Sequence, residues 1–354
     1  MAAACILVGS VTAARAEVDH AAIASAALDE VIRPGFAALA KSTTDLDASV
    51  ATLCSKPSAE SLDATKRAFA STVSEWSKVE ILRFGPIIQD RRYERLFYWP
   101  DPKGLGTRQI KDALAKKDQA VTEPAKLAEK SVALQGLPAL EYLLYGDGSE
   151  TLAQSGGDGE FRCHFAAAVA ANITTIAKDV QEGWSDGAPA AKAFLEPALD
   201  NPVYRTPKEV TLELFKAFTS GIELVRDQKL AKPLGASPEQ AKPRLAALWR
   251  SGRAFASMAG NLEGVRALFA QGGLAQIVAQ DSPGAEKSVL FDLDRAISVL
   301  RGIGVPADEA FRDVDLRAKL EALRVSLKSA RDTAGDLIAR GAGLSFGFNA
   351  MDGD

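Results

Sequence analysis

The sequence predicts an all-α protein of long helices, and three observations support this. Apolar residues recur at three- and four-residue spacing along most of the chain, which is typical of amphipathic helices. Alternating patterns typical of strands are almost absent. Helix start signals also fit, because Ser58 is a capping residue and Ser237 precedes a proline at the first helical position. The predicted helices cover residues 21–54, 58–84, 159–184, 207–230, 237–269 and 315–341.

The two halves of the chain resemble each other in pattern. Residues 55–82 and residues 235–262 each follow a long predicted helix and a loop, and each precede irregular sequence. This similarity predicts an internal duplication that gives two helical-bundle domains. Proline, asparagine and threonine break the helical pattern at 198–209. We therefore expect an N-terminal bundle at 17–200 and a C-terminal bundle at 201–354.

Irregular segments are expected to interrupt the first bundle. Residues 83–110 are dense in arginine, aromatic residues, glycine and proline, and residues 145–160 form a polar stretch. Ligand clefts are common where two domains meet. The interface between the two bundles is therefore the expected position of a ligand site.

Composition excludes some partners. The chain has 354 residues and a formal net charge of −4, and no basic tail or stripe is visible in it. Proteins that bind nucleic acid usually carry such a basic footprint. Nucleic acid is therefore not an expected partner.

Residues 1–16 are interpreted as a Sec-type signal peptide, with a short buried helix as the alternative. An apolar stretch runs from Ala2 to about Ala13 and ends in Ala14-Arg15-Ala16, an A-x-A cleavage pattern. The stretch is too short for a permanent membrane span. No basic residue precedes it, which is consistent with a start codon further upstream. Cys5 is a weak candidate for lipid attachment, because no leucine lies three residues before it. The expected location is the periplasm.

Two cysteines, Cys54 and Cys163, remain after residue 16. An oxidising periplasm allows such a pair to form a disulfide. The bridge would close a loop of about 110 residues and stabilise the fold by roughly 4–5 kcal/mol on the chain-entropy account. Two separate buried thiols are the alternative, which the sequence leaves open.

Several catalytic motifs are absent from the sequence. The two histidines, His20 and His164, are far apart, and there is no H-E-x-x-H motif of a zinc protease. The stretch "GLSFG" at 343–347 matches G-x-S-x-G, but a predicted helix precedes it and no histidine follows, so it lacks the context of a nucleophile elbow. No phosphate-binding or dinucleotide-binding loop is present.

Two carboxylates lie in apolar surroundings. Glu80 follows Trp76 by four residues, so the two side chains share a helix face. Glu141 lies in "QGLPALEYLLYG", residues 135–146, where Pro138 is a good first helical residue. Two interpretations of Glu141 stay open. It is either a metal ligand or a first-turn carboxylate that the helix dipole stabilises by about 0.3–1 kcal/mol.

These stretches together resemble the imelysin family of bacterial envelope proteins. The first matches a W-x-x-x-E-x-x-x-F-G-P type of signature at Trp76, Glu80, Phe84, Gly85 and Pro86. The second matches the family's G-x-H-x-x-E motif at Gly136 and Glu141. The similarity runs over most of the chain after residue 16 and includes the C-terminal "GFNAMDGD".

The resemblance implies two four-helix-bundle-like domains with a site at their interface. Members of the family are linked to iron acquisition, and one was described as an insulin-cleaving membrane protease. In the family motif, the histidine and the glutamate lie three residues apart on one helix face, which suits a metal ion. Here Pro138 stands at the histidine position, so one presumed ligand is lost. The chain resembles the subgroup of predicted periplasmic lipoproteins that carry proline there.

We therefore expect a ligand site between the bundles near Glu80 and Glu141, which could hold a metal ion as a pair. Oxygen ligands favour Ca²⁺, Mn²⁺ or ferric iron over zinc. Arginines could instead bind a small anion such as an iron chelate or a sugar acid. The alternative is that residues 91–95 form a solvated face, paired with Asp90 and Glu94. The expected ligand-contacting residues are Trp76, Arg83, Arg91, Arg92, Arg95, Gly136, Pro138, Asn349 and Asp352.

The expected function is a periplasmic binding protein in iron or metal acquisition. Its partner would be a metal ion, an iron complex or a small anionic ligand. Two alternatives remain. The first is a metal-dependent peptidase, for which the sequence shows no convincing catalytic machinery. The second is a non-catalytic envelope protein that docks a protein partner.

Overall fold

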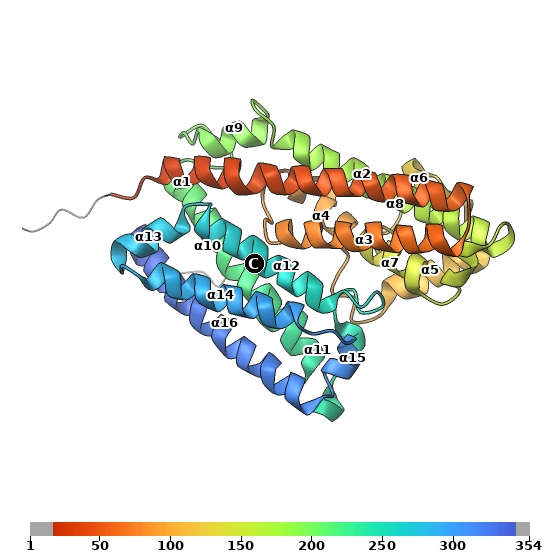
Figure 1. The fold of residues 1–354 in the computed structure, drawn as a ribbon. Coiled ribbons are helices and arrows are strands. Elements are labelled where there is room, and N and C mark those ends of the chain that lie inside the picture. The colour runs from red at the N-terminus through yellow and green to blue at the C-terminus, as the bar shows by residue number, and fades with distance from the viewer. Residues whose placement is uncertain (1–16, 345–354) are drawn as a thin grey trace, which may run out of the picture.

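The computed structural model describes residues 17–344, and within this range the chain forms helices and turns without a β-strand (Figure 1). The predicted all-α class is confirmed. The expected signal segment 1–16 and two expected ligand residues, Asn349 and Asp352, lie outside the described residues. Within residues 17–344, no helix has both the length and the apolar character that a membrane span requires.

The first half is built on three long helices. Helix α1 (His20–Ala27) continues through a π-helical turn at Leu28–Ile32 into α2 (Arg33–Ser55), and α3 (Ala59–Val79) and α8 (Gly157–Gly183) pack along α2 (Figure 1). Ser58 caps α3 as predicted, because its hydroxyl accepts a hydrogen bond from the Ser61 backbone N–H at 3.1 Å. The shorter helices are α4 (Arg92–Leu96), α5 (Leu105–Lys116), α6 (Pro124–Ala128), α7 (Gly136–Tyr145) and α9 (Pro189–Leu195).

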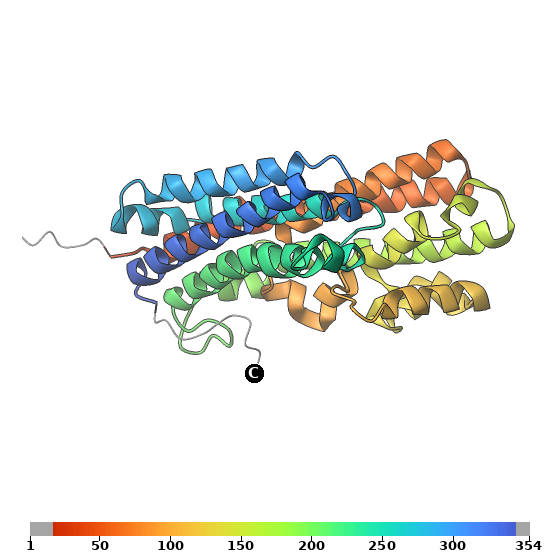
Figure 2. The ribbon, with the colours of Figure 1, turned by 90° about the horizontal axis from the view of Figure 1, so that it is seen from below.

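The second half is a bundle of four main helices. Helix α12 packs against α14 and α10, and α16 packs against α14 and α13. Figure 1 and Figure 2 show this bundle toward one end of an elongated molecule, with α5, α6 and α7 of the first half toward the other end. The helices are α10 (Pro207–Glu223), α11 (Lys232–Leu234), α12 (Ala254–Ala270), α13 (Leu274–Asp281), α14 (Ala285–Arg301), α15 (Ala307–Ala310) and α16 (Val314–Gly341).

One predicted helix is wrong over its first half. Residues 237–269 were expected to form a single helix, but regular α-helix begins only at Ala254. Pro238–Gln240 and Pro243–Leu245 form isolated 3₁₀ turns instead. Pro243 has no backbone N–H and a fixed φ, so it interrupts a helix at its own position. We call residues 235–253 the wall segment, because they form one wall of the cavity described below.

The two halves meet along α3 and α12. Two glycines, one turn apart on α12, let the backbones approach closely: a Cβ on Gly260 would lie 2.7 Å from the Ser77 Cβ, and one on Gly264 would lie 2.0 Å from the Lys78 carbonyl oxygen. Helix α1 also packs against α10 of the second half. The expected boundary near residue 200 therefore divides the helices into two groups along the sequence. In space, however, residues 20–27 contact both groups. The predicted internal duplication stays a prediction.

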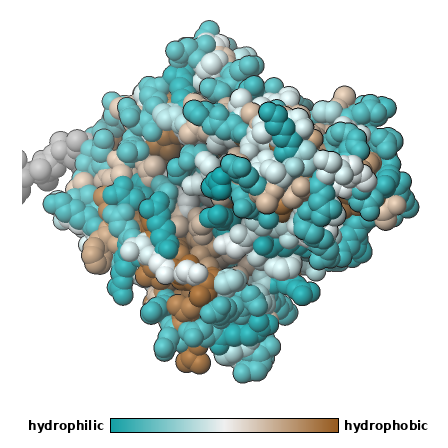
Figure 3. Space-filling view, turned by 45° about the vertical axis from the view of Figure 1, so that its right-hand side comes forward, coloured by the Kyte–Doolittle hydropathy of each residue, from teal (hydrophilic) through white to brown (hydrophobic). Residues whose placement is uncertain are grey.

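The surface is mostly polar. Figure 3 shows hydrophilic side chains over most of one face, with an apolar strip toward its lower edge. Large apolar side chains that are exposed in the second bundle include Phe291 on α14 and both Val314 and Val325 on α16. None of these three residues lines the cavity described below.

Cys54 and Cys163, whose pairing the sequence leaves open, form a disulfide. The bond joins the last turn of α2 to α8, with the two Cα atoms 5.5 Å apart and a sequence separation of 109. The bridge fastens two of the three long helices of the first half to each other. Its stabilising effect arises mainly because it restricts the unfolded chain.

Removing this bridge tests its contribution. The Cys54→Ser/Cys163→Ser double variant should lose about 4 kcal/mol of unfolding free energy, as expected for a loop of this length. Urea unfolding followed by circular dichroism measures the loss. A reducing agent should lower the midpoint of the wild-type protein and leave that of the double variant unchanged. A wild-type midpoint that does not respond to complete reduction would contradict the prediction.

Candidate functional site

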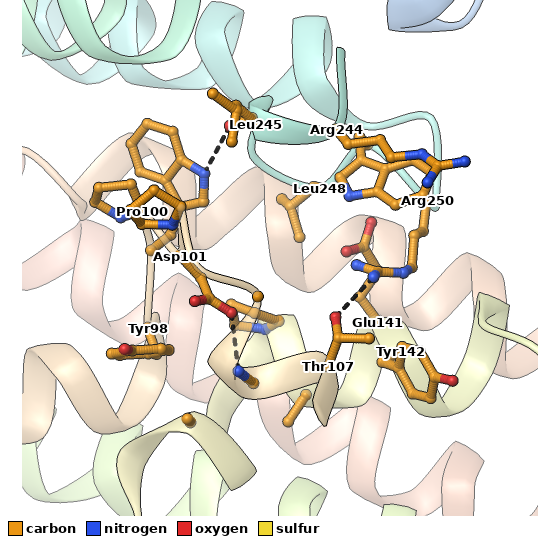
Figure 4. A pocket seen from close by; sticks show the side chains of 18 of the residues that line it. Tyr98, Pro100, Asp101, Thr107, Glu141, Tyr142, Arg244, Leu245, Leu248 and Arg250 are labelled. Atoms are coloured by element: carbon orange, nitrogen blue, oxygen red, sulfur yellow. Dashed lines mark hydrogen bonds between the residues drawn. The ribbon is translucent and has the colours of Figure 1, made fainter. Parts of the chain in front are cut away.

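A cavity of about 670 Å³ lies between the two halves (Figure 4). The first half contributes residues 97–111 and part of α7, and the second half contributes the wall segment and two residues near α11. In Figure 4 the side chains of Thr107 and Glu141 rise from one side toward Leu248 and Arg250 on the other. Its volume is in the range of small-molecule sites. A cavity therefore exists between the bundles, where the sequence predicts a ligand site.

Trp99 and Arg250 help to hold the wall segment over this cavity. The Trp99 indole N–H donates a hydrogen bond to the Leu245 carbonyl oxygen at 3.2 Å. Arg250 donates from Nη2 to the Thr107 hydroxyl at 2.8 Å. Leu248 has φ +56°, a left-handed conformation that bulky side chains rarely adopt. Such backbone persists where surrounding contacts enforce it, and it is concentrated at binding sites.

Arginine and aromatic side chains form a stacked group at one side of the cavity. The Arg250 guanidinium lies 4.5 Å from the centroid of the Trp249 ring and 5.2 Å from that of Tyr142. Arg244 lies 5.6 Å from the Trp249 centroid. Stacking of this kind holds a guanidinium in place and leaves its N–H groups available at the edge.

The cavity lining is basic. Six cationic side chains line it against three carboxylates, and among the described residues only one of these cations, Lys111, forms an ion pair, with Asp147 at 2.8 Å. Asp101 accepts hydrogen bonds from the Leu105 and Gly106 backbone N–H groups, both at 2.8 Å, so it caps α5. The third carboxylate is Glu141. The six cations are Lys103, Arg108, Lys111, Lys232, Arg244 and Arg250.

Glu141 is buried at the cavity wall, with 2% of its surface exposed. Its Oε1 accepts hydrogen bonds from the Ser251 backbone N–H at 2.8 Å and from the Ser251 hydroxyl at 2.7 Å. Helix α7 begins at Gly136, so Glu141 lies in the second turn. The dipole effect is largest in the first turn. The helix-start interpretation of Glu141 is therefore not supported, and the hydrogen bonds of this carboxylate join α7 to the wall segment.

Burial raises the pKa of Glu141, and the hydrogen bonds from Ser251 and the charge of Arg250 oppose this effect only in part. The folded protein therefore binds the proton of this carboxyl more tightly than the unfolded chain does. Stability from this group is present at low pH and declines as pH rises through the raised pKa.

The Glu141→Gln variant removes this titration while keeping the side-chain shape and an oxygen that accepts from Ser251. We expect the wild-type protein to lose stability relative to this variant as pH rises from about 4 toward 7, since ordinary glutamate titrates near 4.3. Urea unfolding at several pH values measures the difference. A difference in unfolding free energy that is independent of pH would contradict the assignment.

Glu80 lies in a separate, fully buried network. Its Oε2 lies 2.6 Å from the Lys229 Nζ and accepts a hydrogen bond from the Asn261 amide at 2.9 Å. Lys229 also donates to the Ser257 hydroxyl at 2.9 Å and to the Asn261 Oδ1 at 2.8 Å. Tyr93 donates to Oε1 at 3.4 Å. Burial lowers the pKa of Lys229, while Glu80 acts in the opposite direction.

In the part of the chain that the structure describes, Glu80 and Glu141 have no hydrogen-bond or ion-pair partner in common. Glu80 is absent from the cavity lining, and a protein cation already neutralises it. Among residues 17–344 there is no group of three or more His, Cys, Asp or Glu side chains that could hold a metal ion. Trp76 also lies away from the lining, fully buried against Tyr93 and Phe97.

Breaking the Glu80–Lys229 pair tests its structural role. Lys229→Met should cost about 3–5 kcal/mol of unfolding free energy, because it leaves a buried carboxylate unpaired. Adding Glu80→Gln to this variant should restore part of the loss. Thermal and urea unfolding measure both effects. If the single and the double variant are equally unstable, the cost does not come from the unpaired charge.

The arginines predicted to bind an anion do not line the cavity. Arg83 stacks on the Tyr93 ring at 4.4 Å, and Arg91 is exposed. Arg92 forms ion pairs with Asp90 and Asp179 at 3.4 and 3.7 Å, which agrees with the alternative of charges paired at the surface. Arg95 donates to the Gln135 side chain at 3.3 Å.

The two small residues of the α7 motif have different roles. Pro138 lines the cavity. Gly136 does not, and it has φ +74°. A Cβ on Gly136 would lie 2.3 Å from the Leu96 carbonyl oxygen, so only glycine fits at this approach of two backbones.

The basic residues that do line the cavity were not singled out in the sequence. Arg244 and Arg250 lie in a stretch whose spacing resembles a helix. The available signal was local: two prolines and the glycines of "GASPEQAKPRLAALWRSG" surround a Trp-Arg pair, a composition typical of a loop.

Comparison with known proteins places this fold in context. A family model described as "Peptidase M75: Imelysin" matches residues 32–333. The iron-regulated protein A of Synechococcus elongatus is 24% identical over 211 residues, which are 58% of this chain and 53% of that protein. The chain therefore spans about half the length of this curated relative.

Two solved structures have the same fold. An imelysin-like protein from Psychrobacter arcticum superposes with a TM-score of 0.76 at 19% identity, covering 94% of this chain and 100% of that one. A putative iron-regulated protein A precursor from Parabacteroides distasonis gives 0.77 at 14% identity, covering 92% and 97%.

Proposed function

This chain belongs to the imelysin family, and we propose that it binds a small, carboxylate-rich anion in the basic cavity between its two bundles. The observation that supports this most directly is the imbalance of charge in the lining, where six cations face three carboxylates that already have protein partners. Basic side chains in a partly desolvated cavity form strong, charge-assisted hydrogen bonds to carboxylates. Stacked Arg250 offers the best-positioned donor.

An iron-related role fits this site best if iron enters as an anionic chelate. Both an iron-regulated relative and an iron-regulated structural neighbour support the link to iron. Among residues 17–344, the cavity lining presents a single carboxylate that is neither a helix cap nor ion-paired, Glu141, and Ser251 already binds it. Cationic hydrogen-bond donors suit the outer carboxylates of a ferric complex better than they suit the ferric ion itself.

The proposed location is the periplasm or another envelope compartment. The disulfide between Cys54 and Cys163 supports this proposal, since such bonds persist in oxidising compartments. The apolar segment before residue 17 and its A-x-A pattern support export as well.

A peptidase function has less support. Ser257 and Lys229 lie within 2.9 Å of each other, as a serine and its general base would. Both side chains are fully buried, however, and neither lines the cavity. Lys229 is also bound to Glu80, which favours its protonated form.

Binding of ferric citrate and of metal-free citrate tests the proposal. Isothermal titration should detect both on the wild-type protein, and Arg250→Gln should weaken both by about tenfold, the effect of losing one charge-assisted contact. Arg301→Gln is the matched control, because Arg301 is an exposed arginine of α14 that does not line the cavity. Equal weakening by both variants, or no binding of either ligand, would contradict the proposal.

A further inference from the structure

A second cavity adjoins the first. It has a volume of about 720 Å³ and is lined by residues near the start of α5, by the wall segment and by α15 with the turn that follows. The two cavities share part of their lining, and these shared residues form a partition between them. The shared residues are Pro102, Arg244, Leu245 and Trp249.

Basic side chains continue across this partition. Arg244 lines both cavities, and Lys242 and Arg312 line the second. Within the described part of the chain, Asp308 is the one carboxylate in the second lining, and its Oδ2 lies 3.5 Å from the Arg312 Nη1. Among the described residues, neither Lys242 nor Arg244 forms an ion pair. The positive charge therefore extends from the first cavity over the partition into the second.

The partition itself is fixed. Trp249 has Arg250 stacked at 4.5 Å and Arg244 at 5.6 Å. The wall segment is tied to the first half on either side of Trp249, since Trp99 donates to the Leu245 carbonyl oxygen and Arg250 donates to the Thr107 hydroxyl. Arginines held in this way lose little further freedom when they bind a ligand.

We propose that the ligand is an elongated polycarboxylate that occupies both cavities, with one end at Arg250 and the other at Lys242 and Arg312. This proposal rests on the proposed function, because it extends the ligand of the same site. A ligand confined to the first cavity would leave the charge of the second without a role in binding. A chain with regularly spaced carboxylates matches basic groups that follow one another along the wall segment.

Two ladders of probes test this length dependence. One ladder contains glutamate and its oligomers of two to four residues, and the other contains galacturonate and its oligomers of the same lengths. Isothermal titration gives the affinity for each. We expect the affinity to rise by about tenfold between the shortest and the longest member of at least one ladder, as for one added charge-assisted contact. The ladder that shows the rise identifies peptide-like or sugar-acid chemistry.

A pair of double variants tests whether the second cavity is the source of the gain in affinity with probe length. Lys242→Gln/Arg312→Gln should abolish the rise with length and leave the affinity for the shortest probe unchanged. Lys319→Gln/Arg301→Gln removes the same charge at exposed positions outside both cavities and should leave the rise intact. Circular dichroism confirms that each variant is folded.

The outcomes separate this inference from the proposed function. If citrate and the shortest probes bind but affinity does not grow with length in either ladder, the two-cavity ligand is wrong and the proposed function stands. If affinity grows with length equally in both double variants, the second cavity is not the site of the gain, and the inference is also wrong. If no probe and no form of citrate binds, both proposals fail.

Discussion

The buried contact between Glu80 and Lys229 is the interaction on which the arrangement of the two halves depends. Glu80 ends α3 of the first half, and Lys229 belongs to the π-helical turn between α10 and α11 of the second. Two opposite charges without exposure to solvent tolerate little displacement, because each would lose the charge it is paired with. Asn261 and Ser257 on α12 complete the hydrogen bonds, and Gly260 and Gly264 allow the helices to come close enough. The cavity is formed at the edge of this fixed contact.

The connection between that contact and the cavity runs through aromatic side chains. The rings of Phe97 and Trp99 lie 5.4 and 5.9 Å from the Lys229 Nζ, and both residues also line the cavity. Trp99 in turn holds the wall segment at Leu245. The Glu80–Lys229 pair thus positions Phe97 and Trp99. Trp99 in turn positions the wall segment, which carries the basic residues of the cavity. Glu80, which does not line the cavity, therefore has a structural role that accounts for its place in the motif that carries the resemblance.

The long helices could be predicted from the sequence because their spacing is a local property. Residues 21–54, 159–184 and 315–341 are helical almost throughout, with boundaries that shift by a few residues. The wall segment could not be predicted this way. Its apolar residues also recur at helical spacing, but they pack against the first half in an irregular segment. The contacts of the predicted site residues could not be predicted for a related reason. Glu80 and Lys229 are 149 residues apart in sequence, and no local pattern identifies such partners. Glu141 and Pro138 were recognised because a motif marked them.

The irregular backbone of the wall segment has a consequence for how such proteins diversify. Helices α3 and α12 carry the contacts that hold the bundles together, whereas residues 242–250 supply most of the second half's contribution to both cavities. Substitutions in a loop change its surface without disturbing a helix–helix interface. Under the proposed function, substitutions in this short stretch would change the ligand contacts and leave the α3–α12 contact in place, and the same fold is found at a sequence identity of 14%.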